Sequence, residues 1–246
     1  MELILRRRFR VASYNVGPGG TARPSAIMGF LEEAAGAQSG EWELSVPHLL
    51  RRGLTWVLSR YHLRLLRPLH FGEEVEVATW PSARSTLFAL RDFEVTGDDG
   101  AVVALATTSW VVIDLASKRP RPLKEVVHDR FALDRRALVD DFATLPKLGP
   151  VPGGVELPVM LRDLDMNLHV NHVVYVQWAL EAVPLPLLQA GWPMDIEIGY
   201  QAEALRGDRI VSTAEEQSGQ EGKRVFIHRI AHARTGVELA RLRTTW

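Results

Sequence analysis

The chain has 246 residues, of which 46% are hydrophobic and 24% are charged, and its 29 basic and 30 acidic side chains give a formal net charge of −1. These values are typical of a globular protein of one or two domains, and the balanced charge gives no reason to expect nucleic acid as a partner. The sequence contains no cysteine, which excludes disulfides, thiolate metal sites and a cysteine nucleophile.

The N-terminal stretch, positions 1–11, reads MELILRRRFRV. Its short apolar run comes before the arginines, whereas a signal peptide has its positive residues first and a longer apolar core. No segment approaches the roughly 18 apolar residues of a membrane span. We therefore expect a cytoplasmic protein without a membrane partner.

The first half of the chain predicts one long helix followed by hairpin-connected strands. Apolar residues recur at helical spacing over positions 25–42. Alternating apolar and polar residues then predict strands, and Asp98-Asp99-Gly100 has the composition of a hairpin turn. The expected strands cover about 54–66, 73–81, 84–96 and 101–114.

A stretch rich in proline and glycine, positions 119–154, interrupts this pattern. It predicts a linker, with a short helix near 134–142.

The second half repeats the order of the first half. Thr244-Thr245-Trp246 matches Thr108-Ser109-Trp110, and each tryptophan lies ten residues after a turn glycine, Gly236 or Gly100. A helix is expected over about 171–182, and strands over about 194–202, 208–217, 223–233 and 237–246. The predicted class is α+β, with an antiparallel sheet packed on a helix in each unit. The expected domains are 1–118, a linker at 119–154, and 155–246.

The segment 163–171, DLDMNLHVN, contains the densest group of candidate catalytic residues. Asp165, Asn167 and His169 alternate, so in an extended segment their side chains share one face. A helix is predicted to begin directly afterwards, with Asn171 as its N-cap. An acid, an amide and an imidazole beside a helix N-terminus suit the hydrolysis of an acyl compound.

Several separated motifs, in the same order, make the chain similar to a known family. It resembles the acyl-[acyl-carrier-protein] thioesterases over nearly its whole length, which implies a tandem hot-dog fold with each sheet wrapped around a long helix. The motifs are YNVGP at 14–18, LTWV at 54–57, SWV at 109–111, LPKL at 145–148, the segment 163–171, Tyr175, Trp178, LE at 180–181, and YQAE at 200–203.

The resemblance implies that Asp165, Asn167, His169 and Glu203 are the catalytic residues. We expect no cofactor and no metal. We expect Glu203 and His169 to activate water, Asn167 to orient it, and Asp165 to fix the start of the helix. Asp165 as base or nucleophile stays an open alternative. Many plant members have cysteine directly after this glutamate, but here the residue is Ala204, so a thiol mechanism is impossible.

The thioester oxygen needs hydrogen-bond donors, and we expect them from the backbone N–H groups of His169 and Val170 at the positive end of the second helix. In an approximate register Gly19, Thr21 and Arg23 stand where the second copy has its polar triplet. The first copy therefore lacks the catalytic set, and the family resemblance implies that it holds the acyl chain. The expected pocket residues are Ile27, Phe30, Leu31 and Trp56.

The resulting hypothesis is hydrolysis of fatty acyl-acyl carrier protein to the free fatty acid, with the carrier protein as partner. One alternative is an acyl-CoA thioesterase, and another is an acyl-binding sensor without catalysis; a hydratase is disfavoured by the motif. A homodimer is left open. Basic clusters could dock the acidic carrier or its phosphate. These clusters are Arg6, Arg7, Arg8 and Arg10, then Arg51 and Arg52, and the segment 118–124.

Overall fold

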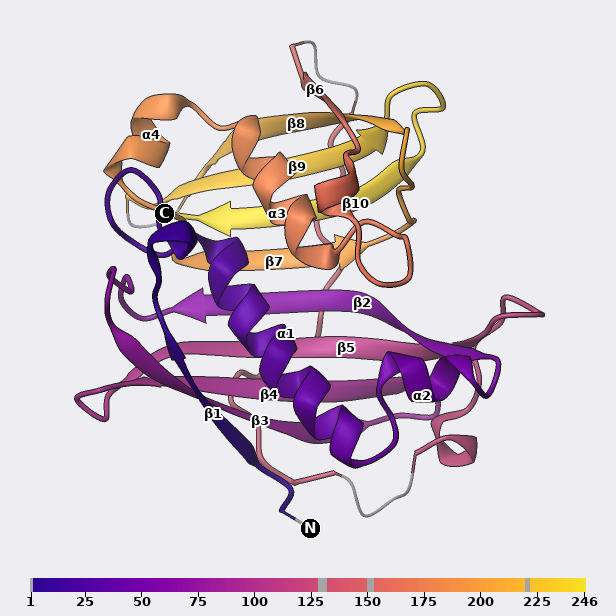
Figure 1. Ribbon diagram of the computed structural model, residues 1–246. Coiled ribbons are helices and arrows are strands. Elements are labelled where there is room, and N and C mark those ends of the chain that lie inside the picture. Colours follow the sequence, from indigo (N-terminus) through magenta and orange to yellow (C-terminus); the bar gives the residue numbers. More distant parts are fainter. Residues whose placement is uncertain (1, 128–131, 150–152, 220–221) are drawn as a thin grey trace.

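The computed structural model describes residues 2–127, 132–149, 153–219 and 222–246. Its strands form one antiparallel sheet in the order β1-β3-β4-β5-β2-β7-β10-β9-β8-β6 (Figure 1). The strands are β1 Leu5–Arg10, β2 Leu54–Leu65, β3 Glu74–Arg84, β4 Phe88–Gly97, β5 Val102–Asp114, β6 Val155–Pro158, β7 Asp195–Tyr200, β8 Arg209–Ser218, β9 Arg224–His232 and β10 Glu238–Thr245.

The helices lie on one face of this sheet (Figure 1). They are α1 Pro24–Glu41, α2 Val46–Leu50, α3 His172–Glu181 and α4 Leu185–Ala190, with short 3₁₀ turns at Ser13–Asn15, Leu123–Glu125 and Leu161–Asp163. Within the described ranges, no helix is both long and apolar enough to cross a membrane.

The strand order runs outward from the centre in the same way on both sides, so the two halves of the chain are two copies of one unit. β2 of the first copy corresponds to β7 of the second, and these two strands pair antiparallel from Arg60↔Gly199 to Arg64↔Asp195. The copies are thereby joined edge to edge into a single sheet, with α1 in front of one half and α3 in front of the other (Figure 1). The expected tandem hot-dog fold is confirmed.

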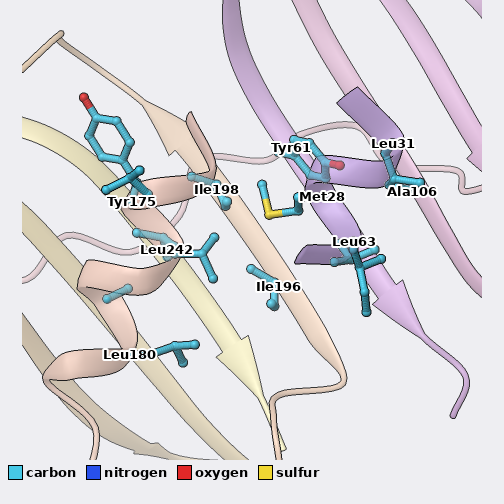
Figure 2. Close-up of a cluster of buried hydrophobic side chains, with 14 of the residues drawn as sticks. Met28, Leu31, Tyr61, Leu63, Ala106, Tyr175, Leu180, Ile196, Ile198 and Leu242 are labelled. Atoms are coloured by element: carbon cyan, nitrogen blue, oxygen red, sulfur yellow. The ribbon is translucent and has the colours of Figure 1, made fainter. Parts of the chain in front are cut away.

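A continuous core fills the space between the helices and the sheet across the seam. Figure 2 shows Met28 of α1 near Tyr61 and Leu63 of β2, and Leu180 of α3 on the side of β7, where Ile196 lies. These side chains are at most 7% exposed, so burial of apolar surface stabilises both copies and the contact between them.

Both long helices and all eight expected strands are present, with shifts of a few residues at their ends. Two edge strands, β1 and β6, were not expected. In β1 the sequence LRRRFR hides the alternation, because three consecutive arginines occupy both faces. Its one aromatic residue, Phe9, stacks on Phe30 of α1 with ring centroids 4.9 Å apart.

The short helix expected near 134–142 is wrong, because these residues contain no helix. They lie instead against the face of the sheet opposite the helices. Buried Asp92 of β4 accepts the amide of Ala137 at 2.7 Å and pairs with Arg136 at 3.0 Å, while the indole of Trp80 donates to the carbonyl of Arg135 at 2.8 Å. These tertiary bonds satisfy backbone groups that a helix would have used internally.

Candidate active site

The segment 163–171 forms a tight turn immediately before α3. The amide of Asp165 donates to the carbonyl of His169 at 2.8 Å, and Leu168 adopts a positive φ of 63° at the tip. The Asp165 Oδ1 atom accepts the amides of Asn167 at 2.7 Å and His169 at 3.2 Å. The Asp165 carboxylate therefore stabilises the turn that carries the side chains of Asn167 and His169.

The imidazole of His169 faces a carboxylate from a distant part of the sequence. Its Nε2 atom lies 3.5 Å from Oε2 of Glu203, in the connection between β7 and β8, and the two side chains are 41% and 57% exposed. This separation is within ion-pair reach but longer than a normal hydrogen bond. The pair is thus open to water and to a substrate.

Three contacts hold the Glu203 segment against the turn. His169 forms a β-bridge with Leu205, and the amide of Val170 donates to the carbonyl of Ala204 at 3.1 Å. The amide of the same residue, Ala204, donates to the hydroxyl of Tyr175 on α3 at 3.3 Å. The fold therefore brings together all four residues that the sequence selected as catalytic.

The backbone amides expected to form the oxyanion hole are engaged inside the protein. The His169 amide donates to Asp165, and the Val170 amide donates to Ala204. The N-cap is as expected, since Asn171 Oδ1 accepts the amide of Val173 at 3.0 Å. In the described part of the chain, the amide of His172, the first residue of α3, has no backbone acceptor, which fits its place among the unpaired donors of a helix N-terminus.

An apolar cavity of about 200 Å³ lies beneath α1 in the first copy and reaches the N-terminus of α3. The His172 side chain from α3 lines this end, with its ring centroid 5.9 Å from that of Tyr61. Glu32 of α1 also lines the cavity and accepts a hydrogen bond from Asn171 at 3.3 Å. The cavity of the first copy is thus lined at one end by His172 of the second copy, which lies three residues after His169 in the sequence. The His169–Glu203 pair itself does not line the cavity.

Only one of the four expected pocket residues, Trp56, lines this cavity. Ile27 and Leu31 are 0% and 1% exposed in the core, and Phe30 packs under β1 against Phe9. The apolar stripe of α1 is its core face, and the adjacent face turns to the cavity. That adjacent face carries Glu32, Ala35, Gly36 and Ser39.

The two halves of the sequence match two domain models of one protein family. Residues 2–131 match the Acyl-ACP thioesterase N-terminal domain, and residues 154–246 match the Acyl-ACP thioesterase C-terminal domain. The chain belongs to the acyl-ACP thioesterase family.

Curated relatives are moderately similar to this family member. The palmitoyl-acyl carrier protein thioesterase of Gossypium hirsutum is 27% identical over 263 residues, which cover 99% of this chain and 64% of the relative. The dodecanoyl-[acyl-carrier-protein] hydrolase of Cinnamomum camphora is 28% identical over 260 residues, 99% of this chain and 68% of the relative. The chain spans somewhat less than two thirds of the length of relatives such as the Gossypium hirsutum protein.

Two solved structures share the fold of this thioesterase-family chain. An acyl-ACP thioesterase from Bacteroides thetaiotaomicron superposes with a TM-score of 0.86 at 23% identity, covering 98% of this chain and 96% of that one. The 12:0-ACP thioesterase from Umbellularia californica gives a TM-score of 0.85 at 24% identity, covering 99% and 97%.

The first copy of this family member repeats the backbone of the candidate active-site turn without its acid, amide and imidazole side chains. The bridge Val16↔Ala22 corresponds to Leu164↔Val170, and Thr21↔His70 corresponds to His169↔Leu205. The side chain of Asn15 accepts a hydrogen bond from the amide of Ala12, just as the side chain of Asp163 accepts one from the amide of Met160.

These contacts place Gly17, Gly19 and Thr21 where the second copy has Asp165, Asn167 and His169. The register taken from the sequence, with Gly19, Thr21 and Arg23 at these places, was therefore two residues out. The first copy still has no acid and no imidazole at the three places.

Three aromatic and imidazole side chains near the thioesterase-family turn had no role assigned from the sequence. Burial raises the pKa of Tyr175 to about 12, with the charges of Glu203 and Asp165 adding to the effect, so its hydroxyl stays protonated. Burial lowers the pKa of His172, which keeps that imidazole neutral. Tyr200 donates to the carbonyl of His172 at 3.1 Å. Tyr175 and Tyr200 are part of the motifs that carry the family resemblance, and this was the only signal in the sequence that they lie near the candidate site.

Among the described residues, one group of side chains has the composition of a metal site. His62, Asp195 and Glu197 offer ligand atoms within 4.8 Å of one another. Each carboxylate, however, is paired with an arginine, Asp195 with Arg64 and Glu197 with Arg243. The charge that would attract a cation is already neutralised, so we interpret this group as an ion-pair network.

Proposed function

We propose that this chain hydrolyses fatty acyl thioesters of acyl carrier protein to the free fatty acid and the carrier thiol. The observation that carries the proposal is the His169–Glu203 pair, held at the N-terminus of α3 where the apolar cavity of the other copy ends. Family membership and the printed activities of the curated relatives support the same reaction.

In the proposed reaction, a water held by Asn167 and the His169–Glu203 pair gives a proton to the pair as its oxygen attacks the thioester carbonyl carbon. The carbonyl electrons move to oxygen, and the amide of His172 at the positive end of the helix dipole donates to this oxyanion. When the oxyanion collapses, the carbon–sulfur bond breaks and the leaving thiolate takes the proton back from the pair.

Asp165 has a positioning role in this scheme. One of its carboxylate oxygens already accepts two amides of the turn, and Asn167 Nδ2 lies 3.4 Å from the other oxygen. Those bonds support a structural function for Asp165, in preference to direct attack on water.

The carrier is proposed to dock on an apolar rim, which consists of exposed side chains in and next to the segments that carry His169 and Glu203. We define the rim by Met160, Leu161, Met166, Leu168 and Leu205, which are 44–75% exposed. Exposed Arg206 follows Leu205, and the side chain of Arg162, beside Leu161, is 83% exposed. Apolar surface flanked by cations is complementary to an acidic protein carrier. Docking on the basic clusters expected from the sequence stays a prediction, and in one of them Arg6 and Arg7 are paired with Glu76 and Glu33.

Rates on two carriers test this function against its alternatives. Wild-type protein should hydrolyse acyl-acyl carrier protein with a higher kcat/KM than the matching acyl-CoA. Leu161→Ser and Met166→Ser should raise KM for the protein carrier and leave KM for acyl-CoA nearly unchanged. Val139→Ser is the control, because Val139 is 83% exposed on the opposite face of the sheet.

Two other outcomes of this assay would contradict the proposed function. Equal or faster turnover of acyl-CoA, unaffected by the rim variants, would favour the acyl-CoA thioesterase. Tight acyl binding without turnover of either thioester would favour the sensor.

We also propose that the protein is cytoplasmic and that two chains associate into a homodimer. The sheet ends in two edge strands, β1 and β6, which offer unpaired backbone groups to a second chain. Light scattering across a range of concentrations measures the association, and fractionation of the source cells measures the location.

A further inference from the structure

A charged side chain lies in the wall of the apolar cavity. Tyr61 of β2, Thr108 of β5 and Arg91 of β4 are directly opposite one another in the sheet. Side chains in such a row share a face, and this row lies beneath α1 and lines the cavity. With about 4.8 Å between strands, the Arg91 backbone is about 10 Å from that of Tyr61, which contacts His172 at the active-site end.

The Arg91 guanidinium has neutral partners. Its Nη1 atom donates to Oε1 of Gln38 at 2.7 Å and to Oγ1 of Thr79 at 3.2 Å. Across the described ranges, no carboxylate lies within ion-pair distance of it. Burial lowers the pKa of Arg91 to about 10, so the group is still a cation at neutral pH.

A guanidinium has five N–H donors on three nitrogens, and here the hydrogen bonds involve one nitrogen among the described residues. The surroundings of Arg91 in the cavity are largely apolar and include Trp56, Phe93 and Trp110. A saturated hydrocarbon packed here would cover these donors without accepting from them, which is unfavourable for a buried polar group. An oxygen atom on the chain would accept from them.

We propose that the cavity selects acyl chains that carry an oxygen, as a hydroxyl, keto or carboxyl group, at the position that reaches Arg91. Arg91 donates hydrogen bonds to this oxygen and so determines chain specificity. The inference rests on the proposed function for the identity of the acyl ligand. Because Arg91 lies across the cavity from His172, the oxygen belongs to the distal part of the chain and not to the carbons beside the thioester.

Binding of acyl-pantetheine amides, in which N–H replaces the thioester sulfur, tests the inference without requiring turnover. Trp42, Trp56 and Trp110 line the cavity, so ligand binding should change the intrinsic fluorescence of the full chain. The acyl groups are straight chains from octanoyl to palmitoyl, each with its mid-chain keto, mid-chain hydroxy, ω-hydroxy and ω-carboxy analogues, and the bulky pantetheine end keeps the saturated parents free of a carboxylate that could pair with Arg91. At the best chain length an oxygenated probe should bind at least about tenfold more tightly than its saturated parent, since a site built to bond an oxygen rejects the analogue that lacks it.

Arg91→Met should remove this preference and bind the saturated parents as well as the wild type does, or better. Arg91→Lys keeps the charge without the planar fork and should retain part of the preference. Arg234→Met, which removes one exposed charge in the turn between β9 and β10, should leave the preference unchanged.

Two results would overturn the inference: saturated parents binding as tightly as every oxygenated analogue in the wild type, or the preference surviving in Arg91→Met. The wild-type comparison decides the matter even if the methionine variant does not fold. Hydrolysis of saturated acyl-acyl carrier protein without any oxygen preference would uphold the proposed function and remove only this inference. Preferential binding of oxygenated chains without hydrolysis of any thioester would uphold this inference and contradict the proposed function.

Discussion

The indole of Trp192 donates to the carbonyl of Thr21 at 3.3 Å, and Thr21 holds the place in the first copy that His169 holds in the second. The same ring packs against Gly17, which replaces Asp165. The first copy therefore has no acid, amide or imidazole at the three corresponding places of this turn, and an aromatic ring covers the space beside it. Under the proposed function, each chain would therefore have one catalytic turn, in the second copy.

Gly17→Ala should destabilise the fold, because the new Cβ would overlap the Trp192 ring. Overpacking of this kind typically costs about 1–3 kcal/mol. Urea unfolding measures it, with Gly19→Ala as the matched control, since a Cβ there would meet only Thr21 Oγ1 at 4.0 Å. Equal unfolding midpoints for the two variants would mean that the ring does not pack as described.

Asp165→Asn and Asp165→Ala separate the two roles considered for this carboxylate. An asparagine still has an oxygen for the amides of Asn167 and His169, so we expect most of kcat and stability to be retained. Alanine removes that acceptor and should cost about 1 kcal/mol of stability together with a large part of kcat. If asparagine abolishes turnover at unchanged stability, Asp165 acts as the base.

Folding should become less favourable at alkaline pH through the network at the seam between the copies. His62 of β2 is 5% exposed, and its ring contacts Asp140 at 2.5 Å and Asp195 of β7 at 3.0 Å. Burial opposes its charged form, but the bonds to Asp195 and Asp140 and the charge of Glu197 outweigh burial and raise the pKa of His62. Conversely, burial is outweighed at Asp195 by the bonds from His62 and Arg64, which lower the pKa of that carboxyl.

The sign of each contribution follows from these directions. The contribution of His62 is full below its unfolded pKa near 6.5 and is lost as the pH rises through the higher folded value. The contribution of Asp195 is full above its unfolded pKa near 3.9 and is lost as the pH falls through the lower folded value. The two are jointly largest between about pH 4 and pH 6.5.

Substitution of His62 by glutamine should therefore cost more stability near pH 6 than near pH 9. Each pKa unit by which folding raises the pKa of His62 corresponds to about 1.4 kcal/mol. Free energies of unfolding at both pH values measure the difference, and His70→Gln, at an exposed histidine, is the control. A His62→Gln penalty that stays constant from pH 6 to pH 9 would contradict the assignment.

The sequence was informative where one local pattern decided the structure. Alternation located eight strands, and helical spacing located α1 and α3. The polar alternation at Asp165, Asn167 and His169 marked the candidate site, although this segment is a tight turn and not the extended segment that was expected. Glu203 came from family resemblance alone, since no local pattern links it to a turn more than thirty residues earlier.

The sequence misled where tertiary contacts decided the structure. The apolar stripe containing Ile27 and Leu31 marks the face of α1 that packs in the core, whereas the cavity touches the neighbouring face. The approximate register of the repeat failed because the offset between the copies changes along the chain. The sequence assigned no role to Arg91, because a single arginine in a strand normally faces solvent.

The most direct test of the account is a double-mutant cycle for hydrolysis of acyl-acyl carrier protein by Glu203→Gln, His169→Gln and the double variant. Glu74→Gln, at an exposed glutamate of β3 in the first copy, is the control. Because the pair acts as one unit, each single variant should lower kcat by about 10²–10⁴, and the double variant should be little worse than either single one. Near wild-type kcat in both single variants, with folding intact, would contradict the account.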